Sequence, residues 1–174
     1  DSIEDLRKSF IAFKNKEGSI KTLLVSLYRI FVKPDKYKYI KEEKGYIYFQ
    51  DFMPGNEYDT RVVVIGGKYA SAERRINRKN DFRASGSGKF SFDNIDIDII
   101  KIAFDVAKKL KIQSVAYDFV YDENKQPKIV EICFGFGNKG IRNSPGYYTD
   151  DLKWHDSKEI PIYKWIIESL IEEK

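Results

Sequence analysis

The chain has 174 residues, of which 42% are hydrophobic and 15% aromatic, and its formal net charge is +4. This length and composition exclude a disordered tail and suit about one domain with a buried core. The single cysteine, Cys133, excludes a framework of internal disulfides. No apolar run approaches the roughly 18 residues of a membrane helix, and the acidic residues 1–5 are unlike a signal peptide. We therefore expect a cytoplasmic protein without a membrane partner.

Two helices are predicted near the N-terminus. Residues 2–14 place apolar side chains at helical spacing behind Ser2, a residue type that often caps a helix. Residues 19–32 repeat this spacing and stop before Pro34, because the position before a proline disfavours the helical conformation. We expect both helices to be packing elements.

A strand and a hairpin are predicted next. Residues 45–52 are rich in aromatic and β-branched side chains, which favours a strand, and the following Pro-Gly-Asn at 54–56 favours a turn. Residues 61–65 and 68–75 flank Gly66-Gly67. This pair predicts a hairpin, because glycine accepts the positive φ that a tight turn needs.

The second half of the chain completes an α+β pattern. Residues 96–110 have the apolar period of an amphipathic helix. Residues 114–122 and 127–133 predict a second hairpin, a long glycine-rich loop follows, and residues 162–173 predict a final helix. This order indicates an antiparallel sheet with flanking helices.

The segment 71–91 concentrates positive charge. It contains six basic residues, Arg74, Arg75, Arg78, Lys79, Arg83 and Lys89, against the two acidic residues Glu73 and Asp81. Its excess of +4 equals the net charge of the whole chain. Such a cluster suits an anion, whether a nucleotide triphosphate, a phosphorylated intermediate or a nucleic-acid backbone. A solvated basic loop is the alternative. The glycine-rich part is not a nucleotide P-loop, since Arg83 and Phe90 occupy the positions of its first glycine and its hydroxyl residue.

An acidic pair stands out on the second predicted hairpin. Strand alternation puts Ala116, Asp118 and Val120 on one face, so a carboxylate lies among apolar groups. If residues 123–126 form the turn, Asp118 faces Glu131, and two carboxylates about 5 Å apart repel each other unless a cation lies between them. Oxygen ligands without histidine suit Mg²⁺ or Mn²⁺. A salt bridge to one of the arginines, without a metal, is the alternative.

Four blocks of the sequence, in this order, resemble the C-terminal half of the ATP-grasp ligases, in the branch that contains glutathione synthetase and the enzymes that add glutamate to a ribosomal protein. The blocks are "FQDFMPGNEYDTRVVVIGGK", "ASAERRINRKNDFRASGSG", "VAYDFVYDENKQPKIVEICFGFG" and the helix between the last two. The resemblance covers residues 46–137. It implies a single, partial ATP-grasp domain whose N-terminal part is missing, with residues 1–49 as the remainder of the small lobe and residues 50–174 as the large C-terminal lobe.

The resemblance also implies roles for individual residues around ATP. The hinge that pairs with the adenine edge is matched by Gln50, Asp51, Phe52 and Met53. Asp59 matches the acid that takes the ribose hydroxyls, with Glu57 as a substitute. The arginines around the triphosphate and the acyl phosphate are matched by Arg61, Arg75 and Arg83, of which Arg75 and Arg83 are the expected catalytic residues.

The metal and substrate sites follow from the same resemblance. Asp118 and Glu131 match the two acidic metal ligands, which is the pair already selected by strand geometry. A loop on the substrate side, whose backbone N–H groups face the transferred phosphoryl group, is matched by Ser85, Gly86, Ser87 and Gly88. Two positions differ from the family: Cys133 and Ser85 each stand where an asparagine is usual.

The resemblance implies an ATP-dependent carboxylate ligase, in which ATP converts a carboxylate into an acyl phosphate that an amine or similar nucleophile then attacks. The expected cofactors are ATP and Mg²⁺ or Mn²⁺, and the expected partner is a small carboxylate or a sugar- or peptide-like substrate. The tail beyond residue 143 resembles that of ATP-grasp proteins of cell-surface polysaccharide synthesis. Two alternatives stay open: a non-catalytic nucleotide-binding fragment and, less favoured, a basic nucleic-acid-binding domain.

Overall fold

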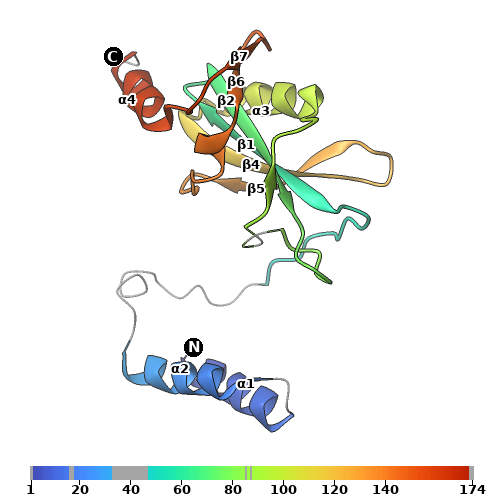
Figure 1. Cartoon of the computed structure of the whole chain (residues 1–174), viewed down its shortest axis with the longest axis vertical. Helices are drawn as coiled ribbons and strands as arrows, with labels where there is room; N and C mark the ends of the chain where they lie inside the picture. Colours follow the sequence, from blue (N-terminus) through green and yellow to red (C-terminus); the bar gives the residue numbers. More distant parts are fainter. Residues whose placement is uncertain (1, 16–17, 33–46, 85, 87, 173–174) are drawn as a thin grey trace. The chain divides into compact units, whose positions relative to one another are not determined.

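The computed structural model describes residues 2–15, 18–32, 47–84, 86 and 88–172. The chain divides into two compact units, residues 1–50 and residues 51–174, which are drawn in Figure 1. Each unit is described by itself. No helix in the described part of the chain is both long and apolar enough to cross a lipid bilayer.

The first unit contains the two predicted helices, α1 (Ser2–Lys14) and α2 (Ile20–Phe31), which pack against each other. α2 begins after Ser19, whose hydroxyl accepts a hydrogen bond from the Thr22 backbone N–H at 3.2 Å. This N-cap supplies an acceptor for one of the amides that the first helical turn leaves unpaired. Both helix predictions are therefore confirmed.

The predicted strand at 45–52 is wrong over its described part. Residues 47–52 have no regular secondary structure and are all exposed, while residues 45 and 46 lie outside the described residues. Aromatic and β-branched side chains favour a strand only where a neighbouring strand gives them a surface to pack on. The predicted turn follows at Pro54 and Gly55. Asn56 then ties the segment to the sheet, because its side chain accepts from the Tyr121 N–H and donates to the Tyr121 carbonyl, both at 2.9 Å.

One antiparallel sheet forms the centre of the second unit. Its strands are β1 (Tyr58–Ile65), β2 (Tyr69–Ile76), β3 (Phe90–Ser91), β4 (Ser114–Tyr121), β5 (Pro127–Cys133), β6 (Gly146–Thr149) and β7 (Trp154–Asp156). They lie in the order β5-β4-β1-β2-β6-β7, and β3 pairs with β2. Both predicted hairpins are confirmed, and Gly66 and Gly67 in the first turn have φ values of 59° and 63°.

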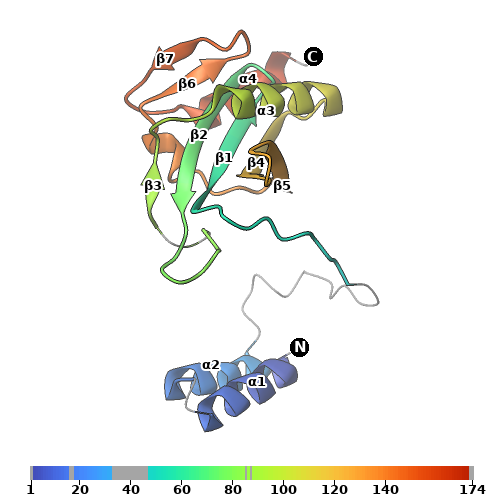
Figure 2. The same cartoon turned by 90° about the vertical axis from the view of Figure 1, so that its right-hand side faces the viewer.

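One face of the sheet is covered by α3 (Ile97–Leu110), which lies in front of β1 and β2 in Figure 2. This is the predicted central helix, and it begins after Asp96, whose carboxylate accepts a hydrogen bond from the Asp98 N–H at 2.9 Å. The core between α3 and the sheet includes Val62, Val64, Val115, Tyr117 and Phe119 from the strands and Ile99, Ile100, Ala103 and Phe104 from the helix.

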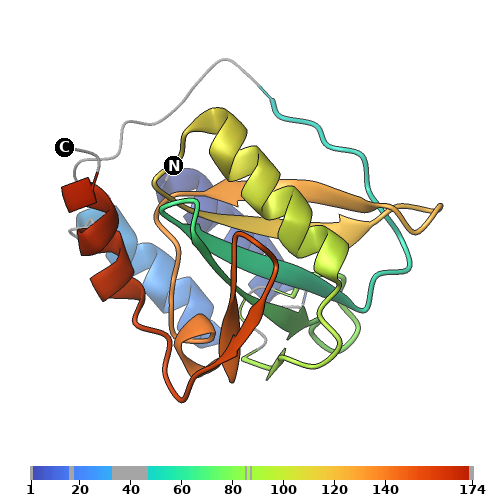
Figure 3. The same cartoon turned by 90° about the horizontal axis from the view of Figure 1, so that it is seen from above.

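The opposite face is covered only in part. The 3₁₀ helix η2 (Ile141–Asn143) and α4 (Ile162–Glu172) bury a second core with Val63, Ile65 and Ala116. Figure 3 shows α4 close to the turn between β1 and β2, where Ser169 contacts Gln113. The strand residues farther from that turn are charged. The predicted site residues of the three central strands lie in this polar half of the face.

Candidate functional site

Four of the predicted residues form one network of ion pairs, here called the arginine–aspartate cluster (Asp59, Arg61, Arg75 and Asp118). Arg61 donates from Nε to Oδ1 of Asp118 at 2.7 Å and from Nη2 to Oδ2 at 2.8 Å. Arg75 binds Asp59 through two hydrogen bonds of 2.6 Å. Its Nη2 also donates to Oδ2 of Asp118 at 2.6 Å. Asp118, at 3% exposure, is thus a buried carboxylate that accepts from two guanidinium groups.

Strand register explains why these residues meet. β1 lies between β2 and β4, and it places Asp59 opposite Arg75 and Arg61 opposite Asp118. Residues two apart on a strand share a face, so Asp59 and Arg61 project to the same side of the sheet. The three strands therefore bring two acids and two bases onto one face.

Glu131 faces Asp118 in the register of β4 and β5, as predicted. The register assumed near the turn is wrong, because Tyr121 pairs with Pro127 and the turn is residues 122–126. A bulge between these positions accounts for the difference, since Asp118 pairs with Glu131 while Phe119 pairs with Ile129. The extra residue reverses the alternation of β5. Ile129 consequently packs into the core beneath α3, although Glu131, two residues later, faces Asp118.

The cluster was also tested for its fit to a metal ion. In the described part of the chain, no group of three or more His, Cys, Asp or Glu side chains is arranged to hold a metal. Asp118 and Glu131 offer two carboxylates on neighbouring strands. Mg²⁺ commonly takes one or two carboxylates from a protein and completes its shell with phosphate oxygens and water. The two carboxylates therefore fit a cation that is bound together with a nucleotide. For this, Asp118 must lose its hydrogen bonds to at least one of the two arginines.

Glu73 is a further carboxylate of this face that the sequence prediction missed. Glu73 stands opposite Arg61 in the register of β1 and β2. Its side chain is buried, at 3% exposure, and its Oε2 has no hydrogen-bond partner among the described residues. Burial raises the pKa of Glu73 to about 7, although Arg75 and Arg61 act to lower it. The alternation of β2 could have identified it, because Glu73 lies two residues before Arg75 and so shares its face.

The electrostatic balance of the face is acidic. Burial acts to lower the pKa of Arg75, but its hydrogen bonds to Asp59 and the charge of Asp118 outweigh burial and raise that pKa. The hydrogen bond to Asp118 likewise raises the pKa of Arg61. Both arginines are therefore fixed cations. They neutralise Asp59 and Asp118, which leaves Glu131 without a matching base inside the cluster among the described residues and favours the approach of a cation.

A contact between Glu73 and Gly140 gives a first testable prediction. A Cβ at position 140 would lie 1.7 Å from Oε2 and 2.6 Å from Cδ of Glu73. We expect Gly140→Ala to lower the free energy of unfolding by about 1–2 kcal/mol, because the buried carboxyl group must move. Urea denaturation measures this change. The matched control is Gly137→Ala in the same loop, where a Cβ would meet nothing within 4 Å. Equal effects of the two substitutions would contradict the prediction.

Arg83 lies on the loop between β2 and β3 and pairs locally in this structure. Its guanidinium binds Asp81, with the shortest distance 2.7 Å, and its side chain is 62% exposed. Hydrogen bonds from Arg83 lower the pKa of Asp81 to about 2. Gly86 and Gly88 have φ values of 76° and 70°, conformations that suit glycine, whereas Ser85 and Ser87 lie outside the described residues.

The predicted adenine hinge contributes an exposed aromatic contact. Asp51, Phe52 and Met53 belong to the second unit, and Gln50 ends the first. The ring of Phe52 meets the ring of Phe82 edge to face, with centroids 5.2 Å apart, and both rings are more than 60% exposed. This contact brings the hinge segment against the basic loop. Two accessible aromatic rings at this place suit a flat heterocycle.

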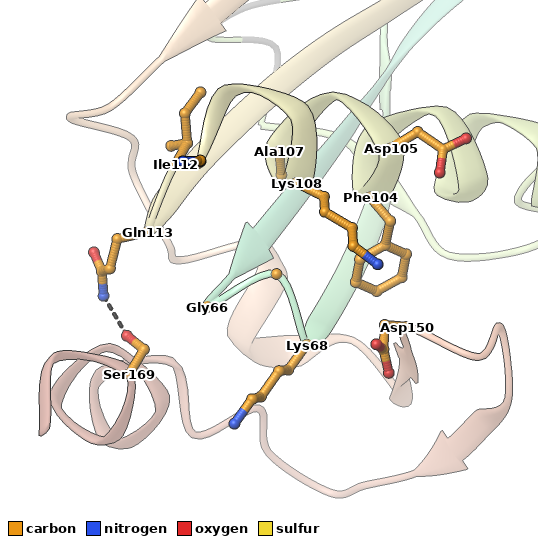
Figure 4. Close-up of a pocket in the computed structure, with 12 residues that line it drawn as sticks. Gly66, Lys68, Phe104, Asp105, Ala107, Lys108, Ile112, Gln113, Asp150 and Ser169 are labelled. Carbon is orange, nitrogen blue, oxygen red and sulfur yellow. Dashed lines mark hydrogen bonds between the residues drawn. The ribbon is translucent and has the colours of Figure 1, made fainter. Parts of the chain in front are cut away.

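A cavity of about 510 Å³ lies elsewhere, beside the turn between β1 and β2 (Figure 4). Its walls come from that turn, from the C-terminal half of α3, and from Gln113, Asp150 and Ser169. Gln113 donates hydrogen bonds to Ser169 and to the Ile166 carbonyl, which fixes α4 to this end of the sheet. The described lining includes none of the predicted site residues. We therefore place the candidate active site at the arginine–aspartate cluster.

Comparison with solved structures finds similarity to one ligase. Two solved structures of the ATP-grasp ligase PsnB are similar to this chain. The complex with a minimal precursor has 14% sequence identity and a TM-score of 0.45, and the alignment covers 71% of this chain and 36% of the PsnB chain. The complex with a phosphomimetic variant of the minimal precursor, Mg and ADP has 15% identity and a TM-score of 0.46, with coverages of 72% and 35%. This chain thus spans little more than a third of the PsnB chain. The search of curated proteins gave no match.

The family model gives the assignment. The model of the RimK-like ATP-grasp domain matches residues 6–150, which is most of the chain. This match confirms the predicted resemblance and the predicted fold class, an antiparallel sheet with flanking helices. The chain belongs to the RimK-like ATP-grasp domain family.

Proposed function

We propose that this chain carries the nucleotide- and metal-binding face of an ATP-dependent carboxylate ligase. A carboxylate oxygen attacks the γ-phosphorus of ATP, ADP leaves, and an acyl phosphate forms. An amine or similar nucleophile then attacks the acyl carbon, the bond to phosphate breaks, and the nucleophile loses a proton. The observation that carries the proposal is the convergence of Asp59, Arg61, Arg75, Asp118 and Glu131 in strand register on one face. It adds to the family assignment.

Arg75 is the best-positioned cation for phosphoryl oxygens. Two hydrogen bonds to Asp59 fix the plane of its guanidinium, and 9% of its side chain is exposed. A guanidinium that is oriented before the substrate arrives stabilises developing phosphoryl charge without reorganisation. In this proposal Asp59 orients Arg75, and it contacts the ribose hydroxyls only by giving up one of these hydrogen bonds. Arg83 and the backbone N–H groups of the loop 85–88 approach the acyl phosphate from the substrate side.

Asp118 and Glu131 hold the divalent cation in this proposal. When bound, the cation neutralises the charge of the phosphoryl group that is transferred. The substrate is a small carboxylate, and the acceptor is sugar- or peptide-like. A non-catalytic nucleotide-binding role is the second candidate, because Cys133 stands beside this pair and a thiol is a poor ligand for Mg²⁺.

The basic segment fits ATP better than a nucleic-acid backbone. Arg74 lies over the ring of Tyr58 at 4.5 Å and donates to the Asn94 carbonyl. Arg75 is buried within the cluster and Arg83 pairs with Asp81. Binding to a nucleic-acid backbone requires solvent-facing cations along a surface. Arg74 and Arg75 on β2 instead have protein partners, and the exposed bases of the segment, Arg78, Lys79, Arg83 and Lys89, lie on the loop between β2 and β3 rather than along the sheet.

Calorimetric titration with a non-hydrolysable ATP analogue, with and without Mg²⁺, tests the proposal. We expect Mg²⁺ to strengthen binding, and we expect Asp118→Asn and Glu131→Gln each to weaken the Mg²⁺-dependent binding at least tenfold, about 1.4 kcal/mol. Glu159→Gln, which alters an exposed ion pair with Arg142, is the matched control. Glu131 is exposed, so its variant stays informative if the Asp118 variant unfolds. A folded chain that binds no analogue, or that binds it equally without Mg²⁺, would contradict the proposal.

A further inference from the structure

One carboxyl group of the polar face has no assigned role. Glu73 is buried at 3% exposure, and its Oε2 has no hydrogen-bond partner within the described part of the chain. Its carboxyl group lies against Gly140, where only a residue without a side chain fits. A buried carboxyl oxygen without a partner is costly to a fold. Such a group is available to a donor of the same face that comes within reach.

Arg61 is the group placed to become that partner. It stands directly opposite Glu73 on β1 and β2, and the Cβ atoms of such cross-strand pairs lie about 4.5–5.5 Å apart. Among the described residues, the ion pairs of Arg61 are with Asp118 alone. A rotation of the Arg61 side chain suffices to exchange one carboxylate for the other.

The two arginines differ in what holds them. Arg75 keeps two hydrogen bonds to Asp59 when its single bond to Asp118 is broken. Arg61 has no second carboxylate partner of this kind among the described residues. A cation that binds Asp118 therefore leaves the Arg61 guanidinium without an ion pair, although its side chain is only 14% exposed. An unpaired buried charge opposes cation binding.

We propose that Glu73 is the positioning residue for Arg61 in the cation-bound state, and that the guanidinium passes from Asp118 to Glu73 when Asp118 binds a divalent cation. This inference rests on the proposed function. The exchange balances the charges of the face. Arg61 then pairs with Glu73, Arg75 stays with Asp59, and the two remaining carboxylates, Asp118 and Glu131, match the two positive charges of the ion. The free edge of Arg61 still offers N–H donors to a phosphate.

A double-mutant cycle on the full chain tests this exchange. The quantity measured is the ratio of the Kd values of the ATP analogue without and with Mg²⁺. We expect Glu73→Gln to lower this ratio about tenfold when Arg61 is present, because a neutral amide holds a guanidinium less strongly than a carboxylate. In an Arg61→Met background, Glu73→Gln is expected to change the ratio less than twofold. Arg61→Gln provides the same comparison if the Met variant does not fold.

The outcomes separate this inference from the proposed function. A tenfold loss confined to the background with Arg61 supports the exchange. An equal loss in both backgrounds overturns it, because Glu73 would then act on the cation or on the fold directly, and so does an unchanged ratio in both. An unmodified chain that shows no effect of Mg²⁺ overturns the proposed function and the exchange together.

Discussion

Asp118→Ala is expected to lower the free energy of unfolding of the second unit by about 3–5 kcal/mol. Asp118 accepts three hydrogen bonds from two arginines and is 3% exposed. Removing its carboxylate breaks both hydrogen bonds of Arg61 to Asp118, so that Arg61 can regain an ion pair only by turning to the buried Glu73, and it leaves Arg75 with Asp59 alone. Because those charges stay largely buried, the loss of one partner costs more than the ion pair itself contributes.

Urea denaturation followed by tryptophan fluorescence measures this change in the second unit, because both tryptophans of the chain, Trp154 and Trp165, belong to it. The matched control is Glu168→Ala, which removes one partner of an exposed pair with Lys164 at 3.6 Å. The expected cost there is under about 0.5 kcal/mol. If the two substitutions cost the same, the cluster does not stabilise the fold in the way described.

Glu73→Gln is expected to stabilise the chain increasingly as the pH rises from about 4.5 to about 7. The pKa of Glu73 is raised from 4.5 to about 7 in the folded chain, chiefly by burial. Between these values the unfolded chain has released the proton while the folded chain retains it, so stability falls as the pH rises. The full shift corresponds to about 3 kcal/mol. A glutamine has no proton to lose and removes this part of the pH dependence.

Urea midpoints of both proteins at pH 4.5, 6 and 8 provide the test. The difference in unfolding free energy between Glu73→Gln and the unmodified chain should be smallest at pH 4.5 and should level off above pH 7. Groups with shifted pKa values that do not act on Glu73, such as Asp81, are common to both proteins and cancel in the difference. Glu168→Gln, which alters an exposed pair with Lys164, is the control. Parallel curves for Glu73→Gln would show that burial does not shift the pKa of Glu73.

The fold could be predicted wherever a local pattern coincides with a tertiary surface. The period of α3 is set by the face that it buries, and Gly66-Gly67 marks a turn whose positive φ values favour glycine. The same logic failed at residues 47–52, where strand-forming side chains are exposed. The short strands β3, β6 and β7 carry too few residues to show an alternation. They form because β2 offers an edge to β3 and β6, and β6 offers one to β7.

The candidate site was predictable in part for a similar reason. Asp118 is recognisable because a strand pattern of apolar residues is interrupted by one acid, and register then selects Glu131. The alternation of β2 places Glu73 on the face of Arg75, but its neighbours Arg74 and Arg75 are charged, and only the folded structure shows that Glu73 is buried. The pairing of Arg75 with Asp59 depends on the register of β1 and β2, which becomes fixed only when the three-residue turn at 66–68 is known.

The bulge in β5 bears on association between chains. Among the described strands, β5 is one end of the sheet, and its outer edge therefore carries backbone groups that another strand could use for hydrogen bonding. Ile132 and the following Phe134 are exposed nearby, which adds apolar surface to that edge. A regular strand of this kind is a template for aggregation. The bulge at Val130 bends and twists the edge of β5 in its middle. The extra residue that brings Glu131 opposite Asp118 therefore also shortens the straight edge to which a strand of a second chain could bind.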